Sequence, residues 1–376
     1  MPTKRMLHLE CARGIASIIV ILHHFSLAFF PVIKEAVWSG GARFTPVYVL
    51  LNGSGAVVYF FMLSGFVLTL GFYRRFSAAK FLAAVLKRLP RLVVPAGASI
   101  LLGYLILKFA PDPHIEASIF SGSNWLKNFG AANIPGEFEP SLADAFRQSI
   151  CVFLHSGDFY YNSNLWTMYD EFYGSLLVFG LVAVSHLIPK CDARMVVVFH
   201  IAAALSSVMM HKNFLAFVVG SFLAFVVARR RTEISISTKV CWILLLSSIV
   251  AFSVGKWIAD IAGSTSLMLA LLGNRRLADR LSGKVGKILG DFSFPLYLVH
   301  TLIIVSLSSA VYVYLSGQNN LASLVLVLTL ASTLFTTAVT AIPFVALDKA
   351  WVSELNKLVL RLTTALRLPV PEKTRE

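Results

Sequence analysis

The sequence has little charge. Only 14% of its 376 residues are Asp, Glu, Lys or Arg, whereas a soluble protein usually carries about 25%. Hydrophobic residues make up 57% of the chain, and the mean hydropathy is +0.75. This composition excludes an ordinary soluble globular protein and predicts a polytopic membrane protein.

Cysteine and acidic residues are also scarce. The four cysteines are far apart and form no C-x-x-C pair, so neither a disulfide framework nor a metal site is predicted. The chain has 19 acidic residues against 33 lysines and arginines, a net charge of +14. The positive residues stand in short clusters between apolar runs, which is typical of membrane topology. We therefore expect no metal and no nucleic-acid partner.

Ten apolar stretches approach the length of about 20 residues that a helix needs to cross a bilayer. With the N-terminus inside, 25 of the 33 lysines and arginines lie in inside segments and 6 in outside segments. Both termini are therefore predicted to be cytoplasmic, with the first stretch kept as a span and not removed as a signal peptide. The stretches lie at 11–32, 54–73, 92–110, 165–188, 194–210, 213–228, 239–256, 259–273, 292–315 and 321–346.

The predicted fold class is all-α, a polytopic membrane helix bundle of about ten transmembrane helices. Residues 1–346 are expected to form the membrane domain, and residues 347–376 a cytoplasmic tail. Apolar residues at helical spacing predict that this tail is an amphipathic helix lying on anionic membrane lipid. These residues are Leu355, Leu358, Val359, Leu362 and Leu366.

A long outward segment, residues 111–164, separates the third and fourth predicted spans. Its prolines and glycines predict a loop for most of its length, with a helix at 141–154 that Ser141 would cap. A loop this long is a candidate acceptor-binding surface or lid, and a plain solvated connection is the alternative.

The first span carries titratable residues on one face. Arg13 and His24 are eleven residues apart, which is about three helical turns and roughly 16 Å along the axis. Such residues are costly inside a bilayer and mark a functional site by default, although interhelical hydrogen bonds would also account for them. His23 points about 100° away from His24 and is the weaker candidate.

Small and basic residues mark the next two segments. Ser64 and Gly65 in the second span are typical of close helix packing. Arg88 and Arg91, in the inside segment 74–91, would share one face of a helix at the cytoplasmic mouth of the third span. Two guanidiniums there suit a phosphate, but the positive-inside rule would supply arginines there in any case.

Polar residues also enter the fourth and ninth spans. Asp170 is expected near the water and Glu171 roughly 9 Å inside the fourth span, unless its carboxylate turns outward to the interface. His300 would lie roughly 13 Å into the ninth span, near the depth of His24. A lone histidine at that depth is also typical of a hydrogen-bond partner within the bundle.

Taken in register, these motifs resemble the acyltransferase-3 family of integral-membrane O-acyltransferases. The chain departs from the family at Glu10, where an aspartate is usual, and in the Thr-Met-Tyr-Asp that precedes Glu171, where Ser-Leu-Ser-Val is usual. The resemblance covers residue 5 to about residue 346. It rests on Arg13-Gly-Ile-Ala with His24, Phe60-Phe-Met-Leu-Ser-Gly-Phe66, Arg88-x-x-Arg91, Leu165-Trp-Thr-Met-Tyr-Asp-Glu171-Phe-Tyr173 and Ser293-Phe-Pro-Leu-Tyr-Leu-Val-His300.

The resemblance implies a reaction and its partners. An acyl group, most simply acetyl, would pass from cytosolic acyl-CoA across the bacterial cytoplasmic (inner) membrane to a hydroxyl of a glycan. Acetyl-CoA is the expected co-substrate. The glycan acceptor would be O-antigen, exopolysaccharide, peptidoglycan or a lipid-linked oligosaccharide.

The resemblance also suggests roles for the polar residues. His24 would act as general base. Arg13 would orient the donor, or pair with Glu10 and another span, and Glu171 would bind sugar hydroxyls or orient a base. The phosphates of CoA would be held by Arg88 and Arg91, helped by Arg74 and Arg75. Substrate contacts are expected from Glu10, Ser64, Trp166, Asp170, Tyr173 and His300.

Two further readings stand beside the acyltransferase. Histidine, arginine and glutamate inside spans also form proton relays, so a proton-coupled exporter is an alternative. The paired halves common in transporters are not visible in this sequence. A non-catalytic scaffold would leave the line of polar residues unexplained. Within the acyltransferase reading, no serine or cysteine stands in a recognisable nucleophile setting, which favours direct transfer over an acyl-enzyme.

Overall fold

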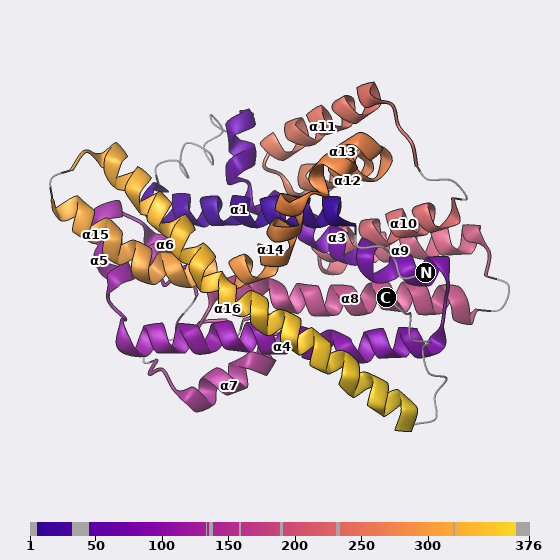
Figure 1. Ribbon diagram of the computed structural model, residues 1–376, viewed down its shortest axis with the longest axis horizontal. Helices are drawn as coiled ribbons and strands as arrows, with labels where there is room; N and C mark the ends of the chain where they lie inside the picture. The colour runs from indigo at the N-terminus through magenta and orange to yellow at the C-terminus, as the bar shows by residue number, and fades with distance from the viewer. Residues whose placement is uncertain are drawn as a thin grey trace.

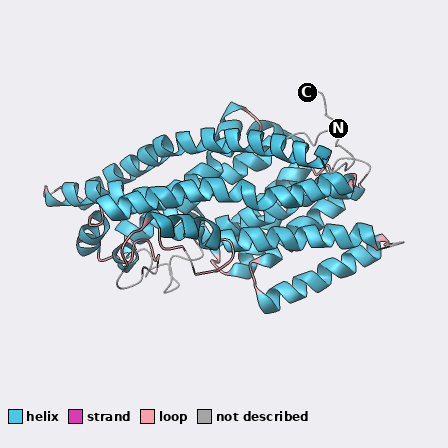
Figure 2. Ribbon diagram, turned by 90° about the horizontal axis from the view of Figure 1, so that it is seen from below, coloured by secondary structure: helices cyan, strands magenta, loops and turns pink. Residues whose placement is uncertain are grey.

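The computed structural model describes residues 6–31, 45–132, 134, 138–157, 159–188, 191–230, 234–318 and 320–365, with side chains up to residue 361. Within these ranges all regular structure is helical (Figure 2). The long helices are α1 (Leu7–Phe29), α3 (Gly53–Arg74), α4 (Ala78–Phe109), α8 (Trp166–Leu187), α9 (Ala193–Met210), α10 (Phe214–Arg229), α11 (Thr238–Ser253), α12 (Trp257–Gly273), α14 (Lys284–Ile303) and α16 (Ala322–Ala365).

Shorter helices connect or extend the long ones. They are η1 (Pro46–Leu51), α5 (Pro113–Ser121), α6 (Asn124–Lys127), α7 (Leu142–Cys151), η2 (Ser163–Leu165), α13 (Arg275–Leu281), the π-helical turn η3 (Ile304–Ser308) and α15 (Ser309–Gly317). Because η3 joins α14 to α15 without a break, residues 284–317 form one apolar helical segment.

Each of the ten predicted spans coincides with a helix, as the apolar runs require. Six helical segments are long and apolar enough to cross a membrane, and α10, α11 and α12 are apolar but shorter. The six segments are Leu7–Phe29, Gly53–Arg74, Ala78–Phe109, Ala193–Met210, Lys284–Gly317 and Ala322–Arg361. The protein is therefore an all-helical membrane protein, while the count of ten crossings and the orientation stay predictions.

The helix that contains the third predicted span begins before residue 92, where that span was predicted to start. Helix α4 begins at Ala78, so most of the inside segment that carries Arg88 and Arg91 is helical. Proline commonly ends a helix, yet Pro90 lies inside α4. In the bilayer, neighbouring helices supply partners for the backbone groups of such a helix, and the indole Nε1 of Trp351 on α16 donates to the Pro90 carbonyl at 2.8 Å.

The last helix combines two predicted elements. Helix α16 runs through both the tenth predicted span and the start of the predicted tail, and it crosses α4 in Figure 1. Leu355 and Val359 are buried against Ala83 of α4, whereas Leu358 is exposed. This part of the tail therefore packs partly on the bundle. The side chains of Leu362 and Leu366 lie outside the described residues.

The outward segment is more helical than predicted. It contains α5, α6 and α7, and α7 packs on α4. Ser141 precedes α7 as expected but makes no side-chain cap hydrogen bond. Instead, the Asp144 carboxylate accepts from Arg147 and from the Tyr160 hydroxyl at 2.6 Å, which ties the helix to the end of the segment.

Small residues set how closely the helices approach. A Cβ at Gly65 would lie 2.2 Å from the carbonyl oxygen of Phe217 on α10, which confirms close packing at the Ser64-Gly65 motif. A Cβ at Gly14 would lie 2.5 Å from the carbonyl oxygen of Leu289 on α14. The second contact holds α1, which carries Arg13 and His24, directly against α14, which carries His300.

Candidate active site

Arg13 is fixed between its own helix and α14. Its guanidinium pairs with Glu10 one turn earlier, at 2.6 Å. It also donates to the Ser293 hydroxyl at 2.7 Å and to the Gly290 carbonyl at 3.2 Å, both on α14. The predicted pairing of Arg13 with Glu10 and a second span is therefore confirmed.

A cavity of about 460 Å³ opens beside Arg13. Its walls come from α1, α3, α4, α8, α14 and α16. The cavity is large enough for part of a small-molecule substrate. Six residues singled out from the sequence line it: Glu10, Arg13, Ser64, Arg88, Arg91 and Glu171.

Arg88 and Glu171 form an ion pair across the cavity. The Ser64 hydroxyl donates to the same carboxylate oxygen of Glu171, and both charged side chains are largely buried, with exposures of 8% and 16%. The sequence placed Arg88 at the cytoplasmic mouth and Glu171 nearer the outer face. This separation is wrong, because the early start of α4 carries Arg88 into the bundle. Arg88 therefore faces a carboxylate and not open solvent.

Arg91 differs from Arg88 although it is one turn away. It is exposed and lines the cavity, with no ion pair or hydrogen bond to any part of the chain that the structure describes. Lys349 on α16, close by on the lining, pairs with Asp291 at 2.8 Å. The sequence analysis did not single out Lys349 or Asp291. Asp291 stands two residues before the motif that runs from Ser293 to His300, and this position is the signal that could have identified it.

Charges on the cavity wall are balanced. Its lining contains four basic and four acidic side chains. Three of the four basic residues are paired within the described residues, whereas Arg91 forms no ion pair there and is attracted electrostatically by Asp348 of the same lining. The basic residues are Arg13, Arg88, Arg91 and Lys349, and the acidic ones are Glu10, Glu171, Asp291 and Asp348.

His24 and His300 contact each other and are not among the residues that line this cavity. Nδ1 of His24 lies 2.8 Å from Nε2 of His300, so the expected similar depth of the two residues is confirmed. Trp125 of α6 stacks on His24, with ring centroids 5.3 Å apart. His23 turns aside, with its Nδ1 2.8 Å from the Leu51 carbonyl oxygen.

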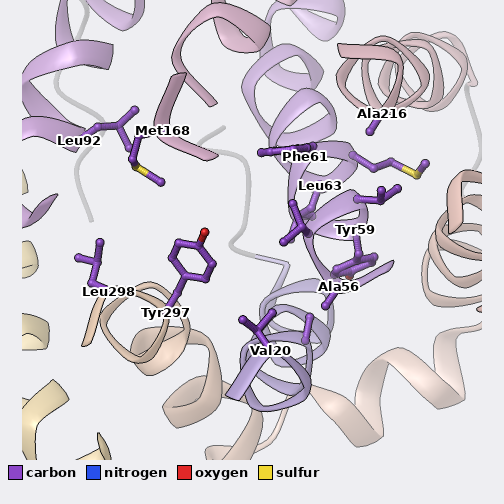
Figure 3. Packing of buried hydrophobic residues seen from close by; sticks show 14 of the residues in the cluster. Val20, Ala56, Tyr59, Phe61, Leu63, Leu92, Met168, Ala216, Tyr297 and Leu298 are labelled. Atoms are coloured by element: carbon purple, nitrogen blue, oxygen red, sulfur yellow. The ribbon is translucent and has the colours of Figure 1, made fainter. Parts of the chain in front are cut away.

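Tyr297 separates the cavity from the histidine pair. It lines the cavity, and its ring lies 5.9 Å from that of His300. Figure 3 shows Tyr297 extending from α14 into the middle of the bundle, with Met168 of α8 nearby. Its hydroxyl is 2.7 Å from that of Thr167 and donates to the Asn164 carbonyl at 2.6 Å. One side chain therefore links the charged cavity to His24 and His300.

Comparison with known families decides the class of this site. The family model described as an acyltransferase domain, that of the acyltransferase-3 family, matches residues 7–343. The chain belongs to the acyltransferase-3 family. It is a membrane O-acyltransferase, which excludes the exporter and scaffold readings. No curated protein and no solved structure shows a significant match.

Several predicted residues of the acyltransferase lie away from the cavity. Arg74 and Arg75 are exposed at the end of α3 and do not line it. Trp166 is exposed at the start of α8. Asp170 is buried and does not face water as expected, because it accepts from the Asn213 amide at 2.7 Å and lies 3.3 Å from His211, both in the connection between α9 and α10. Tyr173 packs against Tyr169 and Phe172.

The acyltransferase also contains a polar network that the sequence reasoning missed. Asn162, Asn164 and Thr167 connect η2 and α8 to α14, through backbone carbonyls and the Tyr297 hydroxyl. All three lie within residues 162–167, just before the acidic pair Asp170 and Glu171 that the sequence analysis emphasised. Among the described residues, no group of three or more His, Cys, Asp or Glu side chains is placed to hold a metal ion.

Proposed function

We propose that this acyltransferase moves an acetyl group from cytosolic acetyl-CoA to a hydroxyl of a cell-surface, secreted or lipid-linked glycan. The observation that carries the proposal is a cavity lined by both Arg91 and Tyr297, with the Tyr297 ring 5.9 Å from that of His300. A donor with an anionic end and a reactive thioester end suits such a path.

Arg91 is the proposed contact for the phosphates of CoA. It has no partner among the described residues and lies on the cavity lining, and a free guanidinium binds phosphate strongly. Arg88 is held by Glu171, so its proposed part is to fix that carboxylate or to exchange it for a phosphate. Arg13, held by Glu10 and Ser293, would orient the acyl end of the donor.

His24 is the proposed general base. Its imidazole would take the proton of the acceptor hydroxyl as that oxygen attacks the thioester carbonyl. The new C–O bond forms, the C–S bond breaks, and the departing CoA thiolate takes the proton from His24. Among the described residues neither His24 nor His300 is hydrogen-bonded to a serine or cysteine, which supports direct transfer without an acyl-enzyme.

The acceptor side is proposed to be the outward segment. Trp125, on α6 in that segment, stacks on His24. A glycan hydroxyl that reaches the free side of the His24 ring would meet the acyl group there. Trp166, exposed at the start of α8, would contact the remainder of the glycan.

Transfer is tested by supplying radiolabelled acetyl-CoA to the cytoplasmic face of sealed inside-out vesicles and measuring label on glycan. We expect His24→Ala to abolish labelling while acetyl-CoA binding and protein level persist. His186→Gln is the matched control, because His186 lies near the end of α8 and outside the cavity. Full transfer by the His24 variant would refute the base assignment, and absence of label from the unmodified protein with all four glycan classes would refute the proposed function.

A further inference from the structure

His300 is the most enclosed titratable group near the site. Its exposure is 0%, and its ring lies between His24 on α1 and the backbone of its own helix. Nδ1 of His300 lies 2.8 Å from the Tyr297 carbonyl oxygen and 3.2 Å from the Leu296 carbonyl oxygen. Both carbonyl oxygens are acceptors without protons, and the one donor near this nitrogen, the Asn164 amide Nδ2, is farther away at 3.3 Å.

These neighbours determine which nitrogen of His300 carries its proton. A bare Nδ1 would direct its lone pair at a carbonyl oxygen 2.8 Å away, which is repulsive, whereas an N–H there donates a normal hydrogen bond. Asn164 does not reverse this assignment. Its Oδ1 accepts from the Thr301 hydroxyl, and its Nδ2 donates to the Tyr297 carbonyl at 3.0 Å.

The position of the proton on His300 in turn determines the position of the proton on His24. With its proton on Nδ1, neutral His300 has a bare Nε2 that accepts. The atom opposite, 2.8 Å away, is Nδ1 of His24, which must be the donor. Neutral His24 therefore has its proton on Nδ1 and a lone pair on Nε2, the nitrogen on the far side of the ring from His300.

We propose that His300 is a positioning residue that fixes His24 in the Nδ1–H tautomer and so presents its Nε2 to the acceptor hydroxyl. Its part in catalysis rests on the proposed function, whereas the tautomer itself does not. The arrangement has the logic of a catalytic triad in which a third group orients the base, but here a neutral imidazole and a backbone carbonyl take the place of a carboxylate.

The proton balance of the step follows from this arrangement. The hydroxyl proton moves to Nε2 of His24 while Nδ1–H stays bonded to Nε2 of His300. The same Nε2–H then passes to the CoA sulfur as the C–S bond breaks. His300 keeps its own proton on Nδ1 throughout. Trp125, stacked on the ring at an interplanar angle of 18°, keeps the plane of His24 fixed while its charge changes.

The π-helical turn η3 follows His300 within one turn, at Ile304–Ser308. Such turns interrupt α-helices most often at functional sites. Here the backbone N–H of Ile304 is shared between the carbonyls of His300 and Thr301. The helix therefore changes its hydrogen-bond pattern at the carbonyl of His300 itself, within residues 295–305, which are all buried.

Two substitutions of His300 separate the effect of its hydrogen bond to His24 from the effect of its side-chain volume. In His300→Gln an amide oxygen takes roughly the place of Nε2 and still accepts from His24. In His300→Phe the ring and its volume remain but no acceptor does. Outer hydrogen-bond partners of metal-bound histidines are worth about 10- to 100-fold. We expect a drop of that order in kcat for His300→Phe, with the KM for acetyl-CoA unchanged, and near-normal kcat for His300→Gln.

The tautomer is measured directly by 15N NMR of histidine-labelled protein in lipid, with His24 assigned by its absence in His24→Gln. We expect a protonated Nδ1 and a bare Nε2 on His24 in the unmodified protein and in His300→Gln, and a mixture in His300→Phe. A proton on Nε2 of neutral His24 in the unmodified protein would overturn the inference, even where His300→Phe fails to fold. If the unmodified protein acylates no glycan, the proposed function fails while the spectrum still decides the tautomer.

Discussion

Replacing Arg88 by methionine tests how the cavity holds its charges. The guanidinium is 8% exposed, and its Nε is buried without a hydrogen-bond partner in the described part of the chain. Its charge therefore depends on Glu171. Arg88→Met leaves the Glu171 carboxylate buried, with the Ser64 hydroxyl as its remaining hydrogen-bond donor among the described residues, an arrangement that should be strongly destabilising.

The magnitude follows from burial and contact. Two unit charges 4 Å apart interact by about 4 kcal/mol at an effective dielectric constant of about 20, and removing one partner of a buried pair typically costs about 3–5 kcal/mol. We expect a loss of that size in the free energy of unfolding for Arg88→Met, and a similar loss for Glu171→Leu. The double variant Arg88→Met/Glu171→Leu should lose far less than the sum, because an apolar pair replaces an ionic pair with little net cost.

The assay is equilibrium unfolding of the purified protein in mixed micelles, with all four members of the double-mutant cycle measured under the same conditions. Arg194→Met is the control, since Arg194 is exposed on α9 and does not line the cavity. Losses that add in the double variant would refute the reasoning, because they would mean that the two side chains contribute to stability independently.

The remaining predictions concern the donor and the outward segment. Arg91→Ala should raise the KM for acetyl-CoA by about 10- to 100-fold, as expected for a lost charged hydrogen bond, and should leave kcat unchanged. Steady-state kinetics, with Arg194→Ala as the control, measures this change, and an unchanged KM would contradict the prediction. Burial against Phe129 lowers the pKa of His114 to about 4. The folded protein therefore binds fewer protons, and stability should fall as the pH drops from about 6.5 towards 4. Thermal unfolding at pH 7 and pH 5 measures this fall, which His114→Phe should reduce.

Local spacing was enough to predict part of the site. Arg13 and Glu10 are one turn apart on one helix, so their pairing follows from helix geometry alone. The similar depth of His24 and His300 follows from counting residues into each span, because a helix rises by a constant step, whereas their contact does not. The apolar runs likewise locate helices, since a backbone in lipid must satisfy its hydrogen bonds internally.

Contacts between distant segments could not be predicted in this way. Arg88 and Glu171 are 83 residues apart, and their contact depends on how α4 packs against α8. The prediction also began the third span at residue 92, whereas α4 begins at Ala78. Lys349 lies on the cavity because α16 continues beyond the predicted last span. Nothing in the spacing of one chain fixes these packing angles.

The balanced charges of the cavity bear on how often the enzyme can turn over. If the donor binds there as proposed, each phosphate that reaches an arginine other than Arg91 replaces a carboxylate already in place. The number of ion pairs then stays constant, and the gain is limited to the difference between phosphate and carboxylate as partners of arginine. When CoA leaves, the same carboxylates return to the same arginines. The carboxylates of the cavity lining would thus replace the CoA phosphates as ion-pair partners of the arginines. CoA would therefore be held weakly and would dissociate quickly.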